Sequence, residues 1–561
     1  MLHNVFPPDL YVTSISIAHY AQRVNIQAYL RGHENKMYKL KVRGTYIMKQ
    51  TFIKGTLILI AASLVTRALG FVYRIFLSRI IGAEGMGLFQ LAFPILMLIL
   101  TFVTAGLPVA ISKLVAEAAV QGARRRIRRI LYASFLIVTI LSIFFTFLLL
   151  QFAPYIAENF LQDDRAYYAM LAMSPIIGIA AISSILRGYF QGLQNMNPSA
   201  LSQIFEQIVR ITTVIYFANL WLPKGVEYAA AGAMVGMVCG EFTGLLILLA
   251  YYLRYKNRPL HSGANAIPQR QTRRQVLYRI VETALPVTFS KAIGSVTYAL
   301  EPIIIAKSLA IAGIAVHQAT AYYGQLAGMV IPLLMFPTVF TYSLSVTLIP
   351  SISEANALHN MQTIGTRVRQ SIHFALIIGV YFSIILFTQA ERLGEALYNQ
   401  PEIKTSLQIL ALFGIFLYLQ SPLAGILQGL GKAKQTMYNS LAGSIIKLTA
   451  IYFLASRPSL HIQGAVIAVV IGALTVTLLH LRITKKYVPV RYPLADISKF
   501  LLIGLIMFCL SSQLSKVLTA WNPWLALTVI LPVTLLAYAC MLLIGKLVTF
   551  EDFIRFRLIR K

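Results

Sequence analysis

Two arginines lie inside one apolar segment of the chain, where a charged side chain is costly to place. Arg67 and Arg74 are seven residues apart, and because seven residues make two turns of an α-helix, both side chains share one helical face. A charge at the centre of a bilayer costs about 2.5 to 3.5 kcal/mol on insertion scales, so it needs a partner, a water-filled cavity or a function. Guanidinium groups bind phosphate oxygens in a bidentate manner. The pattern therefore favours a cavity for a phosphate-bearing anion.

A second apolar segment carries an acid that could balance these arginines. Glu301 is followed by Pro302, and proline loosens a helix, which suits a bent or moving segment. We expect Glu301 to compete for the two arginines when the anion is absent, and we place Lys291 and Tyr298 of the same segment in the cavity. Other charges in or beside apolar segments are secondary candidates, of which the arginines could instead only extend to the membrane surface. These residues are Arg79, Arg187, Arg210, Glu241 and Lys447.

The sequence lacks the motifs of common enzyme classes. It has no GxxxxGK[ST] phosphate loop, no HExxH zinc motif and no GxSxG nucleophile motif. The nine histidines form no pair with ligand spacing, and the three cysteines, Cys239, Cys509 and Cys540, lie in apolar runs without a CxxC spacing. We therefore expect no enzymatic activity, no metal and no cofactor. Coupling to an ion gradient or to the membrane potential stays open.

Composition places the chain in a membrane. Of its 561 residues, 58% are hydrophobic and 12% are charged, and the mean hydropathy is +0.71, which is far too apolar for a soluble domain. The formal net charge of +30 could suggest nucleic acid, but the basic residues form short clusters between apolar runs of about 20 residues, the length of a membrane span. We expect a polytopic protein of the bacterial cytoplasmic membrane that binds no nucleic acid.

Fourteen apolar runs predict an all-α membrane protein with fourteen transmembrane helices. Basic residues cluster after the second, sixth and twelfth runs. Because cytoplasmic loops carry the excess of Lys and Arg, both termini are predicted to be cytoplasmic. The runs are 55–78, 86–108, 130–150, 168–190, 200–222, 228–252, 281–307, 318–342, 371–390, 405–428, 436–456, 462–482, 498–518 and 523–548.

The chain contains an internal repeat. Gln191-Gly192-Leu193 recurs as Gln428-Gly429-Leu430, and Glu117-Ala118 recurs as Glu354-Ala355, both at an offset of 237 residues (428 − 191 and 354 − 117). Six spans per half in one orientation predict a parallel repeat of two pseudo-symmetric lobes around a central cavity, with two added C-terminal helices. The predicted divisions are an extension without membrane pattern before a start-like methionine (1–47), the N-lobe (48–252), a cytoplasmic linker (253–280), the C-lobe (281–482) and the last two helices with a tail (483–561).

Four segments resemble one known family. They are 66–74 (TRALGFVYR), 78–90 (SRIIGAEGMGLFQ), 106–117 (GLPVAISKLVAE) and 187–192 (RGYFQG). The family is that of stage V sporulation protein B, in the multidrug/oligosaccharidyl-lipid/polysaccharide exporter superfamily. This superfamily also holds the lipid II flippases and, more distantly, the MATE drug exporters.

The resemblance implies a V-shaped, MATE-like fold that opens alternately to either side of the membrane, with a lipid-linked cell-wall precursor for the spore cortex as cargo. Arg67 is similar to a helix 1 arginine that recognises pyrophosphate in lipid II flippases. The next arginine–acid pair of those proteins falls on Tyr73 and Arg74 here, so the charge is shifted by one residue. The two C-terminal spans correspond to helices associated with the polyprenyl tail.

Together these observations predict a flippase for a lipid II-like peptidoglycan precursor. Its partners would be a lipid-linked saccharide pyrophosphate and membrane lipids, with cell-wall synthases as a further open partner. Three alternatives remain: an exporter of another lipid-linked polysaccharide unit, a MATE-like cation-coupled drug antiporter, and a membrane scaffold for cell-wall synthases. A drug antiporter is disfavoured by the two extra helices and by arginines where such exporters carry an acid in helix 1.

Overall fold

The computed structural model describes residues 52–104, 106–256, 272–488 and 493–548, all within one compact unit, Ile47–Lys561. These residues form helices and short connections, and no strand occurs among them. Helices are expected because a lipid-embedded backbone must satisfy its own hydrogen bonds. The predicted extension 1–47 and most of the predicted linker and tail lie outside the described residues.

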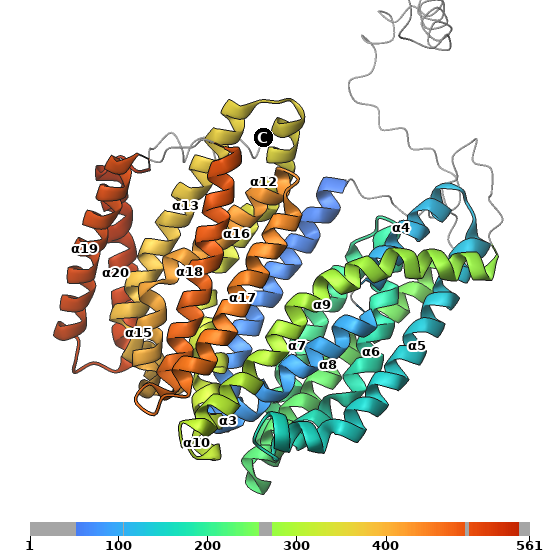
Figure 1. The fold of residues 1–561 in the computed structure, drawn as a ribbon, viewed down its shortest axis with the longest axis horizontal. Coiled ribbons are helices and arrows are strands. Elements are labelled where there is room, and N and C mark those ends of the chain that lie inside the picture. The colour runs from blue at the N-terminus through green and yellow to red at the C-terminus, as the bar shows by residue number, and fades with distance from the viewer. Residues whose placement is uncertain (1–51, 105, 257–271, 489–492, 549–561) are drawn as a thin grey trace, which may run out of the picture. The chain divides into compact units, whose positions relative to one another are not determined.

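Helices of the first half of the chain pack side by side (Figure 1). α3 is the longest and contacts α5, α6, α7 and α8. The elements are α3 (Phe52–Thr104), α4 (Leu107–Val120), α5 (Arg124–Tyr155), η2 (Ile156–Phe160), α6 (Ala166–Gly192), α7 (Asn197–Trp221), η3 (Leu222–Lys224) and α8 (Val226–Tyr255).

The second half is also helical, with more breaks. Its elements are α9 (Arg273–Ile311), α10 (Val316–Tyr323), η4 (Gly324–Val330), α11 (Ile331–Met335), α12 (Thr338–Ala357), α13 (Met361–Thr388), α14 (Ala390–Leu393), η5 (Gly394–Tyr398), η6 (Pro401–Ile403), α15 (Lys404–Leu412), α16 (Gly414–Gly429), α17 (Ala433–Ala455), α18 (His461–Tyr487), α19 (Leu494–Val517) and α20 (Pro523–Ile544).

The described residues hold nine helices that are long and apolar enough to cross a membrane. The number is eleven if two bent pairs, Val316–Met335 with Thr338–Ala357 and Pro401–Leu412 with Gly414–Gly429, each form one span. α7 and α17 are not among them, because polar and charged side chains lower their hydropathy. The first two predicted runs form the single helix α3, which is broken only at Gly82 (φ 68°, ψ −171°), a backbone conformation that favours glycine.

The second part of α3 meets α10 and η4 through reciprocal contacts. Gly87 packs against the carbonyl oxygen of Thr320, and Gly324 packs against the carbonyl oxygen of Ala83, so that neither position has room for a methyl group. The residues that correspond at the repeat offset, 83 with 320 and 87 with 324, thus exchange places in the two contacts. Such an exchange is the mark of a two-fold related interface.

A hydrogen bond continues this interface along α3. The amide Nε2 of Gln90 donates to the carbonyl oxygen of Ala327 at 2.8 Å, and these two residues are themselves 237 positions apart. Each of them therefore contacts its own repeat counterpart, as happens only close to a two-fold axis. The offset found in the sequence recurs in these contacts.

Helix α9 contacts helices from both halves of the chain. Its first part packs on α4 and α5, and there the backbone N–H of Gly106 donates to Thr288 Oγ1 at 3.2 Å. Two turns further along α9, Ser295 Oγ and Thr101 Oγ1 lie 2.6 Å apart. The last part of α9 packs on α17. α9 therefore joins the two sets of helices.

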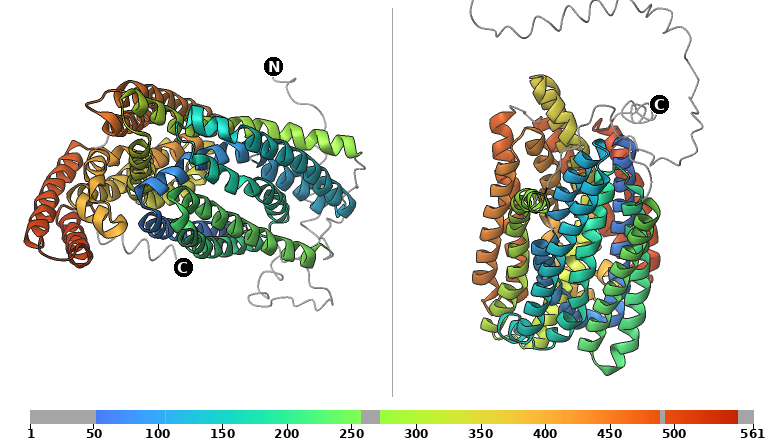
Figure 2. Two further views of the ribbon diagram at one scale, coloured as in Figure 1. Left: turned by 90° about the horizontal axis from the view of Figure 1, so that it is seen from below. Right: turned by 90° about the vertical axis from the view of Figure 1, so that its right-hand side faces the viewer.

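α19 and α20 lie at the edge of the bundle beside α13 (Figures 1 and 2). Hydrogen bonds fasten α20 there: Tyr381 Oη donates to the Leu531 carbonyl at 3.1 Å, and Tyr538 Oη donates to the Ile377 carbonyl at 2.9 Å. α19 is held by Ser511 Oγ, 2.7 Å from Thr388 Oγ1 of α13. Interhelical hydrogen bonds of this kind strengthen packing where lipid offers no alternative partner. The pair is therefore attached to α13 along its length.

The reciprocal glycine contact makes a testable prediction. Gly87→Ala places a methyl group against a backbone carbonyl that no side-chain rotation can move, and overpacking of this kind typically costs about 1–3 kcal/mol. We expect a lower melting temperature for the detergent-solubilised variant, measured by tryptophan or dye fluorescence. Gly178→Ala on α6 is the matched control, because a methyl group there would meet nothing within 4 Å. Equal melting temperatures for the two variants would contradict the tight contact.

Candidate functional site

The helix α3 presents Arg67 and Arg74 outside any ion pair. The Arg67 guanidinium lies over the ring of Tyr342 on α12, 4.6 Å from its centroid, which is a cation–π arrangement. Arg74, two turns further along the same face of the helix, is half-buried. Within the described part of the chain, no carboxylate lies within ion-pair distance of either arginine.

Three tyrosines from three elements lie within electrostatic range of Arg74. Its positive charge acts on the hydroxyl groups of Tyr73 on α3, Tyr298 on α9 and Tyr398 on η5. The hydroxyls of Tyr73 and Tyr398 are buried and have no hydrogen-bond partner among the described residues. Phenolic O–H groups are donors. Arg74 and these tyrosines therefore gather donors without matching acceptors, as a site for an anion requires.

Glu301 does not face the two arginines. One of its carboxylate oxygens lies 2.6 Å from Nζ of Lys447 on α17, and only 12% and 21% of the two side chains are exposed. The expectation that Glu301 pairs with Arg67 and Arg74 is therefore wrong for this structure, because the end of α9 packs on α17 and brings the lysine to the acid. Lys291 lies exposed on the same helix, away from this pair.

Arg79 fastens α3 to η5 instead of facing the tyrosines around Arg74. Its Nε donates to the Leu397 carbonyl at 2.8 Å, and its Nη2 donates to the Ala396 carbonyl. The guanidinium also lies over the Trp524 ring of α20, 5.6 Å from the centroid. Carbonyl groups at a helix end lack intrahelical partners, and Arg79 supplies donors to them.

The other secondary candidates, Arg187, Arg210 and Glu241, come together with Glu206 in one cluster between α6, α7 and α8. Nη2 of Arg187 lies 2.8 Å from Glu206 and 3.7 Å from Glu241. Nη2 of Arg210 bonds Glu206 and lies 3.4 Å from Glu241. Two cations and two anions offset one another in this cluster.

A further polar cluster that the sequence does not predict links the connection between η2 and α6 to α3 and α10. Arg165 binds Glu84 at 2.6 Å and Asp163 at 2.8 Å, while Asp163 accepts from Thr320 Oγ1 at 2.6 Å. His317 Nδ1 lies 2.6 Å from Glu84. Although burial works against it, hydrogen bonding to Asp163 and Glu84 raises the pKa of Arg165. The members come from three distant segments, and no spacing in the sequence connects them.

Metal binding finds no support in the described residues, which contain no group of three His, Cys, Asp or Glu side chains placed to hold an ion. The chemistry that the arrangement offers is the binding of an anion at the tyrosine-lined arginine of α3. Charge pairs elsewhere hold helices together.

Comparison with known proteins gives matches over most of the chain. The family model for "Polysaccharide biosynthesis protein" matches residues 52–356, and the MatE model matches residues 325–453. Stage V sporulation protein B of Bacillus subtilis (strain 168) is 43% identical, over 83% of this chain and 90% of the relative. The Bacillus subtilis lipid II flippase MurJ is 28% identical, over 76% of this chain and 81% of the relative.

A solved structure shares the fold. An inward-facing multidrug resistance MATE family transporter of the MOP superfamily superimposes with a TM-score of 0.60, at 17% identity, over 78% of this chain and 98% of the other. This MATE structure is named as a transporter, and the MurJ relative is named as a flippase. The expectation of a protein that is not an enzyme is thus confirmed.

These matches and the apolar helices identify a multi-pass membrane protein of the flippase and exporter type. The resemblance to the stage V sporulation protein B family is confirmed by the matched relative. This chain belongs to the polysaccharide biosynthesis protein family.

Proposed function

We propose that this protein is a flippase that moves a lipid-linked saccharide pyrophosphate, of the lipid II type, across the bacterial cytoplasmic membrane by alternating access. The observation that carries the proposal is Arg74, a half-buried arginine with no carboxylate partner among the described residues, in electrostatic range of three tyrosine hydroxyls. The named activity of the MurJ relative supports the cargo class, and the sporulation relative supports a role in spore cortex synthesis.

The physical argument rests on charge compensation. An arginine away from water needs a negative partner, because an uncompensated buried charge is costly. A pyrophosphate carries about two negative charges and accepts bidentate hydrogen bonds from guanidinium groups. Arg67 lies about 10 Å from Arg74 along the helix, as seven residues at 1.5 Å rise require. One arginine can therefore hold the pyrophosphate while the other contacts the adjoining sugar or phosphate.

The fold that we propose for this transporter has fourteen spans in two six-helix lobes and a C-terminal pair. Fourteen result if α3 counts as two helices divided at Gly82 and if α7 and α17 join the eleven apolar spans. The reciprocal contacts of Gly87 and Gly324 support the two-fold relation. The lobes would follow the predicted divisions 48–252 and 281–482, joined by the linker 253–280, with helices and tail in 483–561.

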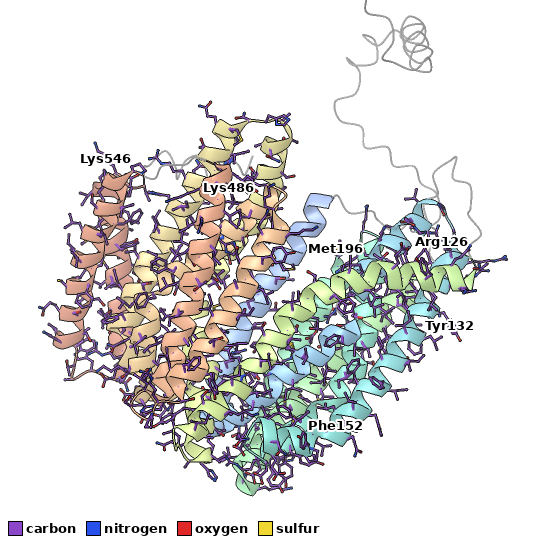
Figure 3. All side chains as sticks on the ribbon, in the orientation of Figure 1. Arg126, Tyr132, Phe152, Met196, Lys486 and Lys546 are labelled. Atoms are coloured by element: carbon purple, nitrogen blue, oxygen red, sulfur yellow. The ribbon has the colours of Figure 1, made fainter. Side chains whose placement is uncertain are left out.

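Cytoplasmic termini are part of the proposal. Arg126, Lys486 and Lys546 lie toward one end of the bundle, while Phe152 lies toward the opposite end (Figure 3). Basic residues gathered at one end agree with the rule that places them in the cytoplasm.

A drug antiporter is the second candidate, because the MatE model matches residues 325–453. Such a protein would bind organic cations, which the positive charge of Arg67 and Arg74 opposes. A scaffold for cell-wall synthases would need neither arginine. The nature of the transported molecule therefore separates the three functions.

The role of the two arginines can be tested by substitution. In proteoliposomes with a fluorescent lipid-linked saccharide pyrophosphate, Arg74→Ala and Arg67→Ala should each lower the flipping rate about tenfold or more, since a hydrogen bond to a charged group contributes about 1.5–3 kcal/mol. Arg74→Lys should recover only part of the rate, because the bidentate geometry is lost. Arg367→Ala, at an exposed position of α13, is the matched control and should leave the rate unchanged.

Full activity in the Arg67→Ala, Arg74→Ala double variant would reject the cargo assignment. Transport of organic cations by the unmodified protein, with no flipping of the lipid, would establish the drug antiporter instead.

The proposed membrane topology can be tested at the predicted linker. Ser262, in the predicted linker and outside the described residues, should be cytoplasmic. In a variant whose three native cysteines are replaced, Ser262→Cys should react with a maleimide only when the reagent crosses the membrane. Reaction with an impermeant maleimide added to intact cells would invert the proposed orientation.

A further inference from the structure

The charge cluster between α6, α7 and α8 has a function still to be assigned. Its two carboxylates, Glu206 and Glu241, are only 8% and 9% exposed. Both lie between the Nη2 atoms of the same two guanidinium groups, those of Arg187 and Arg210. Like charges that share one site repel, and the repulsion favours protonation of one of them. Two acids held between two shared cations are therefore a place where a proton can reside.

The two acids are not equivalent. Glu206 has the short contacts, 2.8 Å to Arg187 and a shorter one to Arg210. Glu241 has only contacts of 3.7 Å and 3.4 Å to the same two side chains. A carboxylate with shorter, better hydrogen bonds keeps its charge more readily. Glu241 is consequently the member of the pair that accepts the proton.

The surroundings of Glu241 contain few other titratable or charged groups. α6 contributes Arg187 and α7 contributes Glu206 and Arg210, and Tyr73 of α3 lies within electrostatic range of Arg210. Gly240 and Gly244 of α8 pack directly on Arg210 and Glu206, which holds α8 and the acid close to α7. The Nε atoms of Arg187 and Arg210 have no hydrogen-bond partner in the described structure, yet 26% and 20% of these side chains are exposed. The cluster is therefore not sealed inside the packed core.

The cluster is electrostatically linked to the site on α3. The hydroxyl of Tyr73 lies within electrostatic range of both Arg74 and Arg210. In addition, Gly70 of α3 packs toward the Gln207 amide of α7, whose oxygen accepts from Arg210. Protonation of Glu241 adds one positive charge to a cluster that is otherwise neutral. The added charge acts on an anion beside Arg74 through these short links.

We propose that Glu241 is a proton-binding site and that its protonation favours binding of the anionic cargo at Arg74. The coupling rests on the proposed function, whereas the proton site rests on the geometry of the four charged side chains alone. Linkage is reciprocal, so binding of the anion draws a proton onto Glu241 to the same extent. The proton moves from water to a carboxylate oxygen, and no bond other than O–H forms or breaks.

The proton site is tested first by infrared difference spectroscopy of the full chain in nanodiscs as the pH is lowered. We expect the band of a protonated carboxylic acid in the unmodified protein and its loss in Glu241→Gln. Glu301→Gln, which removes an equally buried acid that has a single 2.6 Å partner, should keep the band. Glu241→Asp should keep a band that titrates at a shifted pH, which distinguishes loss of the acid from loss of the fold. A band that persists unchanged in Glu241→Gln overturns the proposal.

The coupling is tested by binding of a short-chain lipid pyrophosphate to the same nanodiscs at two pH values on either side of that titration. Affinity should be about three- to tenfold higher at the lower pH, as expected for one added positive charge in a medium between protein and water, and it should not depend on pH in Glu241→Gln. Equal pH dependence in both proteins overturns the coupling. Absence of binding in the unmodified protein contradicts the proposed function, and the infrared result still decides the proton site.

Discussion

The cost of holding a charge away from water decides where the arginines of this protein lie. Arg187 and Arg210 share two carboxylates, and Arg79 donates to helix-end carbonyls. Each of these groups is compensated by the protein itself, and the helices that carry them are thereby fixed to one another. Arg74 has no carboxylate partner among the described residues and lies within electrostatic range of tyrosine hydroxyls, two of which make no hydrogen bond there. The difference separates a group that stabilises the fold from one that can recognise a ligand.

Glycine sets the second constraint, which is the distance between repeated segments. At Gly87 and Gly324 two backbones touch, and a side chain on either would separate them. The Gln90 side chain crosses the same interface and donates to the Ala327 carbonyl, so backbone contact and a hydrogen bond together hold the repeated segments close. Helix α9, which contacts both sets of helices, must change its contacts when they move. In the proposed alternating access, the glycine contact would be the part of the molecule that changes least and α9 the part that changes most.

Much of the helical fold could be predicted from the sequence, because hydropathy reports directly on helices such as α5, α6 and α18. The repeat offset could also be predicted, because it depends only on matching residue identities. The breaks within helices were harder to predict from the sequence. Pro302 lies inside an uninterrupted α9, whereas Gly82 interrupts α3. The ion pair of Glu301 with Lys447 was missed because its members are 146 positions apart. Partners chosen by tertiary packing leave no periodic signal, so the chemistry of each charge was predictable and its partner was not.

The attachment of α19 and α20 to α13 carries a consequence for evolution. His373, Tyr381 and Tyr538 all bond to main-chain carbonyls, at Leu547, Leu531 and Ile377. A main-chain acceptor is the same whatever residue provides it, so the acceptor positions can exchange one apolar side chain for another without loss of the hydrogen bond. Leu531 and Leu547 can therefore vary among apolar residues while the three donors keep α20 beside α13.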